Sequence, residues 1–183
     1  MVLVELAQRS LPIPDGVQLS VEARHVKVTG PKGTLEEDFA HLPVSFDLEK
    51  GSLRVYSQWA RKREVALVGT AIAHVRNMIR GVTNGYTYKL KTVYAHFPVT
   101  VKVQEKERRL TIENFTGEKT PRVIRIVGSA KVKIAGDEIH VQGTNLRDVS
   151  QTASNIQQGT RIRDKDQRVF LDGIYIFEKT EGS

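Results

Sequence analysis

The residues best suited to chemistry in this chain are basic side chains in a polar stretch near its C-terminal end. They are Arg161, Arg163, Lys165 and Arg168. Guanidinium and ammonium groups donate charge-assisted hydrogen bonds to phosphate oxygens, so this cluster favours a polyanionic ligand. Acidic residues alternate with Lys165, and a solvated loop without any ligand would give the same mixed pattern.

Two smaller basic groups come earlier in the chain. Lys89 and Lys91 alternate within a tyrosine-containing run, and Lys119 and Arg122 flank a proline after a glycine turn. Nearby aromatic rings could stack on unpaired bases, although the tyrosines could equally belong to a hydrophobic core. We therefore predict a nucleic-acid-binding set made of Lys89, Lys91, Lys119, Arg122, Arg161, Arg163, Lys165 and Arg168, which the family resemblance described below implies is an RNA-binding set.

Residue patterns typical of catalysis are missing from the sequence. The chain has no cysteine, and its five histidines are scattered without the i,i+4 spacing of a helical metal site. The segment 128–130 lacks the second glycine of a serine-hydrolase elbow, and in 30–34 the lysine precedes the glycine, unlike in a phosphate-binding loop. We expect no enzymatic activity, no cofactor and no metal.

The charge of the chain also favours a polyanionic partner. Its formal net charge is +7, from 28 basic and 21 acidic side chains. Residues 1–82 carry 11 basic against 9 acidic side chains, and residues 83–183 carry 17 against 12. We therefore expect the second half to make more of the contact. No apolar run approaches the roughly 18 residues of a membrane span, and no secretory signal is present, so we expect neither a membrane span nor secretion.

The elements that must position these residues form two units joined near residues 80–91. An apolar stripe at helical spacing predicts a helix over about 61–80, which Gly81 would close from the C′ position. Alternating residues before it, from an extended entry at 11–16 onwards, predict short strands. The chain should therefore divide into domains 1–82 and 83–183.

The second domain repeats the pattern of the first. Strand-like runs follow Pro98, and a second helix should begin near Asn145, which can cap it. Matching positions lie 84 apart: Pro14 and Pro98, Val26 and Leu110, Val28 and Ile112, Gly33 and Gly117, Val65 and Val149, Ile72 and Ile156. This offset predicts an α+β fold of two duplicated domains, each a small antiparallel β-sheet arrangement packed on one α-helix. The apolar, alternating segment 169–179 should add a last strand.

Several motifs together resemble one known family. They are Gly81–Tyr86, Tyr94–Pro98, Asn114–Lys119 and Arg168–Tyr175. Over nearly its whole length the chain resembles the universal large-subunit ribosomal protein L6 family, in its archaeal and eukaryotic branch. The Pro-Lys-Gly turn at 31–33 is widespread in that family, and the run Phe170–Tyr175 is specific to the branch.

The resemblance implies a function. Members of this family bind large-subunit ribosomal RNA near the sarcin-ricin loop and the stalk base, largely through the second domain. Translation factors dock nearby, and other large-subunit ribosomal proteins are neighbours. The resemblance further implies a protein of the cytoplasmic large subunit that has no catalytic activity and is not a homo-oligomer. One alternative remains open from the residues alone, a duplicated sheet module whose basic face binds an acidic protein.

Overall fold

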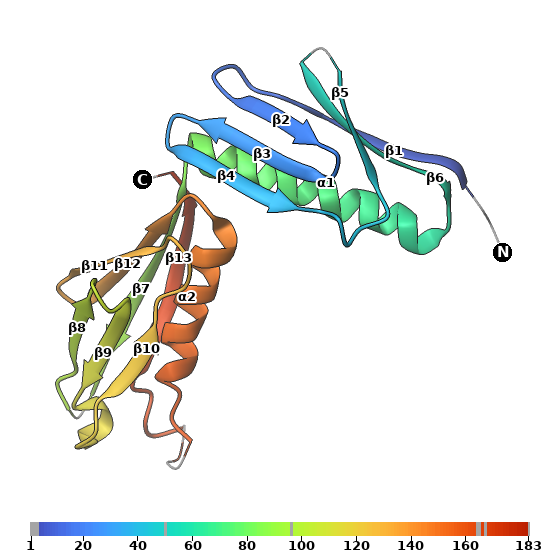
Figure 1. Cartoon of the computed structure of the whole chain (residues 1–183). Coiled ribbons are helices and arrows are strands. Elements are labelled where there is room, and N and C mark those ends of the chain that lie inside the picture. Colours follow the sequence, from blue (N-terminus) through green and yellow to red (C-terminus); the bar gives the residue numbers. More distant parts are fainter. Residues whose placement is uncertain (1–3, 50, 96, 164–165, 167, 183) are drawn as a thin grey trace. The chain divides into compact units, whose positions relative to one another are not determined.

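The structure of the chain is a computed structural model that describes residues 4–49, 51–95, 97–163, 166 and 168–182. It divides into two compact units, residues 1–84 and 85–183 (Figure 1). This division falls two residues beyond the expected one at 82/83, because the first helix is longer than the sequence predicts. Neither helix in the described part of the chain has the length and apolar character needed to cross a bilayer.

The first unit consists of two antiparallel sheets and one helix. One sheet has the strand order β1-β6-β5 and the other β2-β3-β4. The helix packs against both sheets, and its stripe Val68, Ile72 and Val75 is buried, as predicted. The elements are β1 (Val4–Pro12), β2 (Gln18–Glu22), β3 (His25–Gly30), β4 (Gly33–Asp38), β5 (Ser45–Glu49), β6 (Ser52–Ala60) and α1 (Lys62–Thr83).

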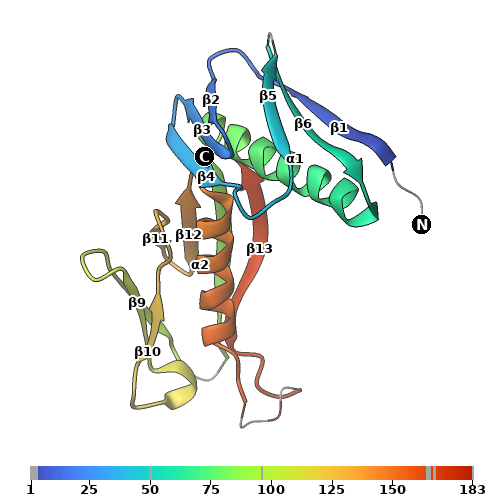
Figure 2. The same ribbon diagram turned by 45° about the vertical axis from the view of Figure 1, so that its right-hand side comes forward.

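The second unit also consists of two antiparallel sheets and one α-helix, with one strand more than the first. A four-stranded sheet has the order β11-β12-β7-β13, and α2 lies along it (Figure 2). A three-stranded sheet has the order β10-β9-β8. The elements are β7 (Tyr86–Val93), β8 (Thr100–Gln104), β9 (Arg109–Glu113), a 3₁₀ turn η1 (Phe115–Gly117), β10 (Arg122–Arg125), β11 (Lys131–Ala135), β12 (Glu138–Gly143), α2 (Leu146–Gly159) and β13 (Gly173–Glu181).

The predicted duplication and α+β class are confirmed by this topology. The strand order β5-β6-β1 matches β11-β12-β7, and β13 is the predicted extra strand. The two helices begin at Lys62 and Leu146, 84 residues apart. One matched pair fails, because Gly33 opens β4 whereas Gly117 ends the 3₁₀ turn, five residues before β10 begins. The repeat therefore holds for the architecture but not for every turn.

The N-terminal strand β1 is missing from the sequence prediction. It pairs with β6 along most of its length, so the first unit begins well before the expected entry at 11–16. Only Ala7 and Leu11 of its described side chains are buried, and they are four positions apart. Without a period-two pattern the strand has no recognisable signature. It is the counterpart of β7, which the sequence shows more clearly.

The predicted end of the first helix at Gly81 is wrong. The helix continues to Thr83, with Gly81 buried inside it, and the left-handed residue is Gly85 at φ 75°. Val82 is fully buried, and its carbonyl accepts a hydrogen bond of 2.9 Å from the backbone N–H of Lys32. The turn between β3 and β4 therefore stabilises an additional helical turn, which compensates for the low helix propensity of glycine.

A buried threonine connects the end of α2 to β13. The Thr160 hydroxyl accepts the backbone N–H of Ile174 at 3.1 Å and donates within the last helical turn, and its side chain is almost wholly buried. We expect Thr160→Val to lower the free energy of unfolding of the second unit by about 2 kcal/mol, because it leaves a buried N–H unpaired. Thr160→Ser, which keeps the hydroxyl, is the matched control in chemical denaturation. Equal losses in the two variants would contradict this role.

Candidate nucleic-acid interface

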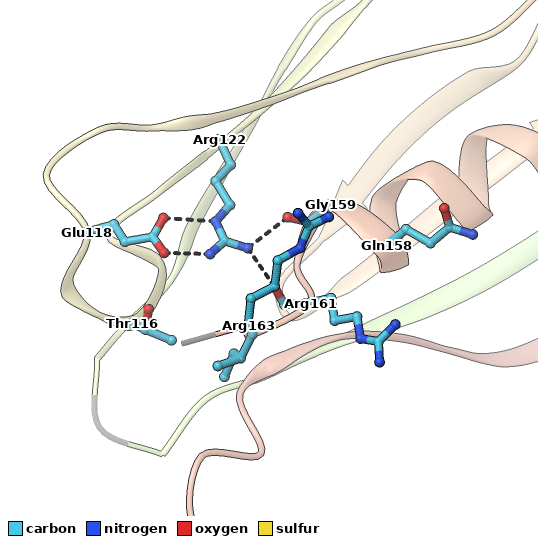
Figure 3. A pocket seen from close by; sticks show the side chains of 8 residues that line it. Thr116, Glu118, Arg122, Gln158, Gly159, Arg161 and Arg163 are labelled. Carbon is cyan, nitrogen blue, oxygen red and sulfur yellow. Dashed lines mark hydrogen bonds and ion pairs between the residues drawn. The ribbon is translucent and has the colours of Figure 1, made fainter. Parts of the chain in front are cut away.

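Three of the predicted basic residues meet around a cavity where α2 ends. The cavity has a volume of about 320 Å³, and its lining includes Arg122, Arg161 and Arg163 (Figure 3). Asn145 begins the helix with a side-chain cap to the N–H of Arg147 at 3.0 Å, as predicted. The buried face of α2, with Val149, Ala153 and Ile156, fixes the helix against the core, so its last turn holds the arginine-bearing segment in a defined place.

Arg122 is held tightly within the protein. Its guanidinium donates to both carboxylate oxygens of Glu118, at 2.8 and 2.5 Å. The Nη1 atom donates to the backbone carbonyls of Gly159 at 2.9 Å and Arg161 at 3.2 Å, and the guanidinium lies 4.3 Å from the ring centroid of Phe115. These contacts occupy Nε and both terminal nitrogens. This geometry gives Arg122 an internal role, because it joins the 3₁₀ turn to the end of α2, and contact of Arg122 with RNA stays a prediction.

Arg161 and Arg163 are differently placed. Both side chains are exposed, and neither forms a hydrogen bond or ion pair with another described residue. Arg161 also lines a second cavity of about 420 Å³, together with Phe170 and Tyr175. Arg161 therefore lies on the rim of both cavities and Arg163 on the rim of the first. We call these two arginines the cationic rim, and their guanidinium groups are available to an external anion.

The lysines of β7 lie elsewhere in the second unit. In the strand register, Lys89 stands beside His140 of β12 and close to Glu178 of β13, and its ammonium pairs with the Glu178 carboxylate at 3.0 Å. Lys91 is exposed two residues further on. Neither residue lines the cavities at the end of α2. Of the aromatic side chains near them, Tyr86 is buried in the core, as the structural alternative predicts.

The remaining predicted residues are close in sequence to the arginines at the end of α2. Lys119 is exposed, directly after Glu118 in the turn that contacts Arg122. Lys165 lies outside the described residues. Arg168 is exposed and pairs with Asp166 at 3.0 Å.

The pair formed by Asp166 and Arg168 supports a prediction about pH. Hydrogen bonds from the Arg168 side chain and backbone N–H lower the pKa of Asp166 from its usual value. A lowered carboxyl pKa stabilises the folded form above the unfolded-state pKa, and this contribution is lost as the pH falls through the folded-state pKa. We expect Arg168→Gln to raise the pKa of Asp166 in an NMR titration. An unchanged pKa would show that the pair does not form in solution.

Glu118 is absent from the predicted set, although it binds the guanidinium of Arg122. Its spacing of four from Arg122 is a signal for an ion pair, although the segment between them is not helical. The two carbonyls that Arg122 also binds carry no sequence signal at all.

Three other features considered in the sequence can be placed in the structure. The described residues contain no group of three or more histidine, cysteine, aspartate or glutamate side chains that could hold a metal ion, and His96 lies outside them. Ser129, in the segment compared with a hydrolase elbow, contacts Asp148 at 3.3 Å. The turn at Pro31 and Lys32 joins β3 to β4 and contacts the end of α1, in agreement with the predicted β-turn.

Fold and site together define a duplicated α+β protein with a cationic rim on the second unit. The chain belongs to the ribosomal protein L6 family, whose model matches residues 13–85 and 97–173. Each matched segment covers most of one unit.

Similar curated proteins agree with this assignment. The large ribosomal subunit protein uL6 of Desulfurococcus amylolyticus is 46% identical over 92% of this chain and 92% of its own length. Those of Staphylothermus marinus and Methanothrix thermoacetophila are each 43% identical, over 97% of this chain and 97% and 99% of their own lengths. All three relatives are archaeal, in keeping with the branch that the sequence motifs indicate.

Proposed function

We propose that this protein is a structural constituent of the large ribosomal subunit, where it binds ribosomal RNA and supports translation without catalysing a reaction. RNA binding is supported chiefly by the two exposed guanidinium groups, those of Arg161 and Arg163, on the rim at the end of α2. Family membership supports the ribosomal part, since its relatives are named as large-subunit proteins.

The mechanism is phosphate neutralisation by side chains held on a rigid unit. A helix C-terminus carries partial negative charge on its free carbonyls, which disfavours a nearby phosphate. Arg122 covers the carbonyls of Gly159 and Arg161 and so offsets this charge. Arg161 and Arg163 are exposed, and no other residue in the described part of the chain binds their side-chain donors, so these can bind phosphate oxygens. Folded RNA is recognised mainly by its shape and backbone.

The family resemblance supports a proposed location within the ribosome. We place the second unit against ribosomal RNA near the sarcin-ricin loop and the stalk base, with neighbouring ribosomal proteins beside it and translation factors close by. The protein acts there in the cytoplasm as a single copy and brings no cofactor. The remaining predicted residues, including Lys89, Lys91, Lys119 and Arg168, extend the proposed contact along the same unit.

Sedimentation of the cellular protein tests this proposal. In a gradient at moderate salt, the protein should move with large subunits in stoichiometric amount. Treatment with ribonuclease should then release it, because RNA provides the contact. A protein that stays at the top of the gradient contradicts the ribosomal assignment. A complex that survives complete RNA digestion would instead favour the alternative, a module that binds an acidic protein.

A further inference from the structure

The single tryptophan of the chain, Trp59, points out of the first unit at a place where the strand pattern would bury it. In β6 the inward-facing residues Leu53, Val55 and Ser57 are buried in strict alternation. Residue 59 should continue that series. Instead Ala60 is fully buried and the Trp59 side chain is 67% exposed.

The backbone at Trp59 produces this reversal. Its φ is 52°, in the left-handed region that bulky residues rarely occupy, and the alternation changes phase at this residue. Strain of this kind persists where the surrounding structure enforces it and is concentrated at functional sites. The strain here turns a large aromatic ring from the core towards the solvent, where most of its surface is exposed, so it gives the folded unit little packing in return.

The exposed ring belongs to a cavity with cationic walls. The cavity has a volume of about 530 Å³, and its lining includes Trp59, Tyr56, Arg24 and Arg61. The guanidinium-bearing side chains of Arg24 and Arg61 are exposed. Glu64 is the one acidic residue of the lining, and its carboxylate accepts the backbone N–H of Arg61 at 2.8 Å. Lys62 and Arg63, which follow Arg61 in the sequence, add further positive charge at the start of α1.

We propose that this cavity binds an unpaired nucleotide of RNA, with its base stacked on Trp59 and its phosphate held by Arg24 and Arg61. An acidic peptide would satisfy the arginines but leave the indole face uncovered, whereas a nucleotide supplies both a planar ring and an anion. The inference extends the proposed function to the first unit. It involves a surface separate from the rim at the end of α2.

Tryptophan fluorescence of the full-length protein tests the site directly, because Trp59 is the only tryptophan. A short oligouridylate should quench the emission in a saturable, salt-dependent way, since base stacking changes the surroundings of the indole. A perfectly paired RNA duplex should quench little, because its bases are not free to stack. Absence of quenching by oligouridylate would overturn the proposal, and so would equal quenching by polyglutamate.

Two charge reversals locate the phosphate contacts. Arg24→Glu and Arg61→Glu should each raise the Kd obtained from the quenching isotherm about tenfold, which is the effect of losing one charge-assisted hydrogen bond. Arg76→Glu is the matched control, because Arg76 is exposed on α1 outside the cavity lining, and it should leave the isotherm unchanged. Equal effects of all three variants would indicate a general charge effect and overturn the site.

A variant of the cationic rim tests the nucleotide site independently of the proposed function. The double variant Arg161→Glu/Arg163→Glu should keep normal quenching by oligouridylate even if its binding to large-subunit RNA is lost. If quenching disappears in that background, the first unit has no independent site. If quenching is normal but the intact protein does not bind large-subunit RNA, the proposed function fails while the nucleotide site stands.

Removal of the strained Trp59 side chain distinguishes a binding role of this residue from a role in stabilising the fold. Trp59→Gly suits the left-handed backbone and removes a side chain that is 67% exposed, so relief of the strain should outweigh the small loss of packing and raise the melting temperature of the first unit by about 4 °C. The same variant should weaken oligouridylate binding about tenfold in fluorescence anisotropy with labelled RNA. A lower melting temperature would show that the ring packs to stabilise the fold, and the proposal would be wrong.

Discussion

Reversal of charge at Arg161 and Arg163 is expected to weaken binding to large-subunit ribosomal RNA by about 100-fold. Both side chains are exposed and have no partner among the described residues, so each can donate its charge-assisted hydrogen bonds to phosphate. Loss of about 1.5 kcal/mol at each position gives this factor. Filter binding of Arg161→Glu/Arg163→Glu over a series of salt concentrations measures both the affinity and the number of phosphates contacted. The salt slope should fall by about one for each lost contact.

The matched control is a double reversal on another part of the same unit. Lys131 and Lys133 are exposed on the edge strand β11, outside the linings of both cavities at the end of α2. Lys131→Glu/Lys133→Glu changes the net charge equally and should lower the affinity far less. If the two double variants lose the same affinity, binding depends on overall charge and the assignment to the rim is wrong. Unchanged incorporation of the Arg161/Arg163 variant into subunits would also reject it.

Loss of the Arg122 side chain is expected to lower the free energy of unfolding of the second unit by about 3 kcal/mol. Arg122→Met removes the donors to the Glu118 carboxylate and to the carbonyls of Gly159 and Arg161. It also removes the cation above the Phe115 ring. The Arg122 side chain is 24% exposed, and Glu118 is 39% exposed, so we expect less than the full effect of breaking a buried pair. Chemical denaturation measures the change.

RNA binding distinguishes the internal role of Arg122 from direct contact with phosphate. If Arg122 only positions the arginine-bearing segment, Arg122→Met should reduce RNA affinity and leave the salt slope unchanged. Arg122→Lys keeps the charge, but a lysine ammonium cannot reach the carboxylate and both carbonyls at once. Its free energy of unfolding should therefore fall about as much as that of Arg122→Met. A slope that falls by about one in Arg122→Met and recovers in Arg122→Lys would show that Arg122 contacts RNA itself.

The sequence predicts the fold well where burial is periodic. The stripe on α1 and the alternating strands of the second unit are visible because buried positions recur at the period of the element. The prediction fails where distant contacts decide the structure. The helix continues through Gly81 because the β3–β4 turn meets Val82, and β1 forms through pairing with β6 and not through its own pattern.

The candidate site divides in the same way. The sequence identifies basic residues and the half of the chain that holds more of them, because charge is a property of each residue. It does not separate Arg161 and Arg163, whose side chains have no partner among the described residues, from Arg122 and Lys89, which are engaged with Glu118 and Glu178. That distinction depends on which acidic groups and carbonyls the fold brings close.

By itself, the sequence determined the α+β class, the duplication, the absence of cysteine chemistry and the excess of positive charge in the second half. These features follow from composition and from short-range periodicity, which each segment carries locally. The tertiary structure alone decided which cations remain available to a ligand and which way Trp59 points. Both depend on hydrogen bonds and backbone geometry between segments that only the folded chain brings together.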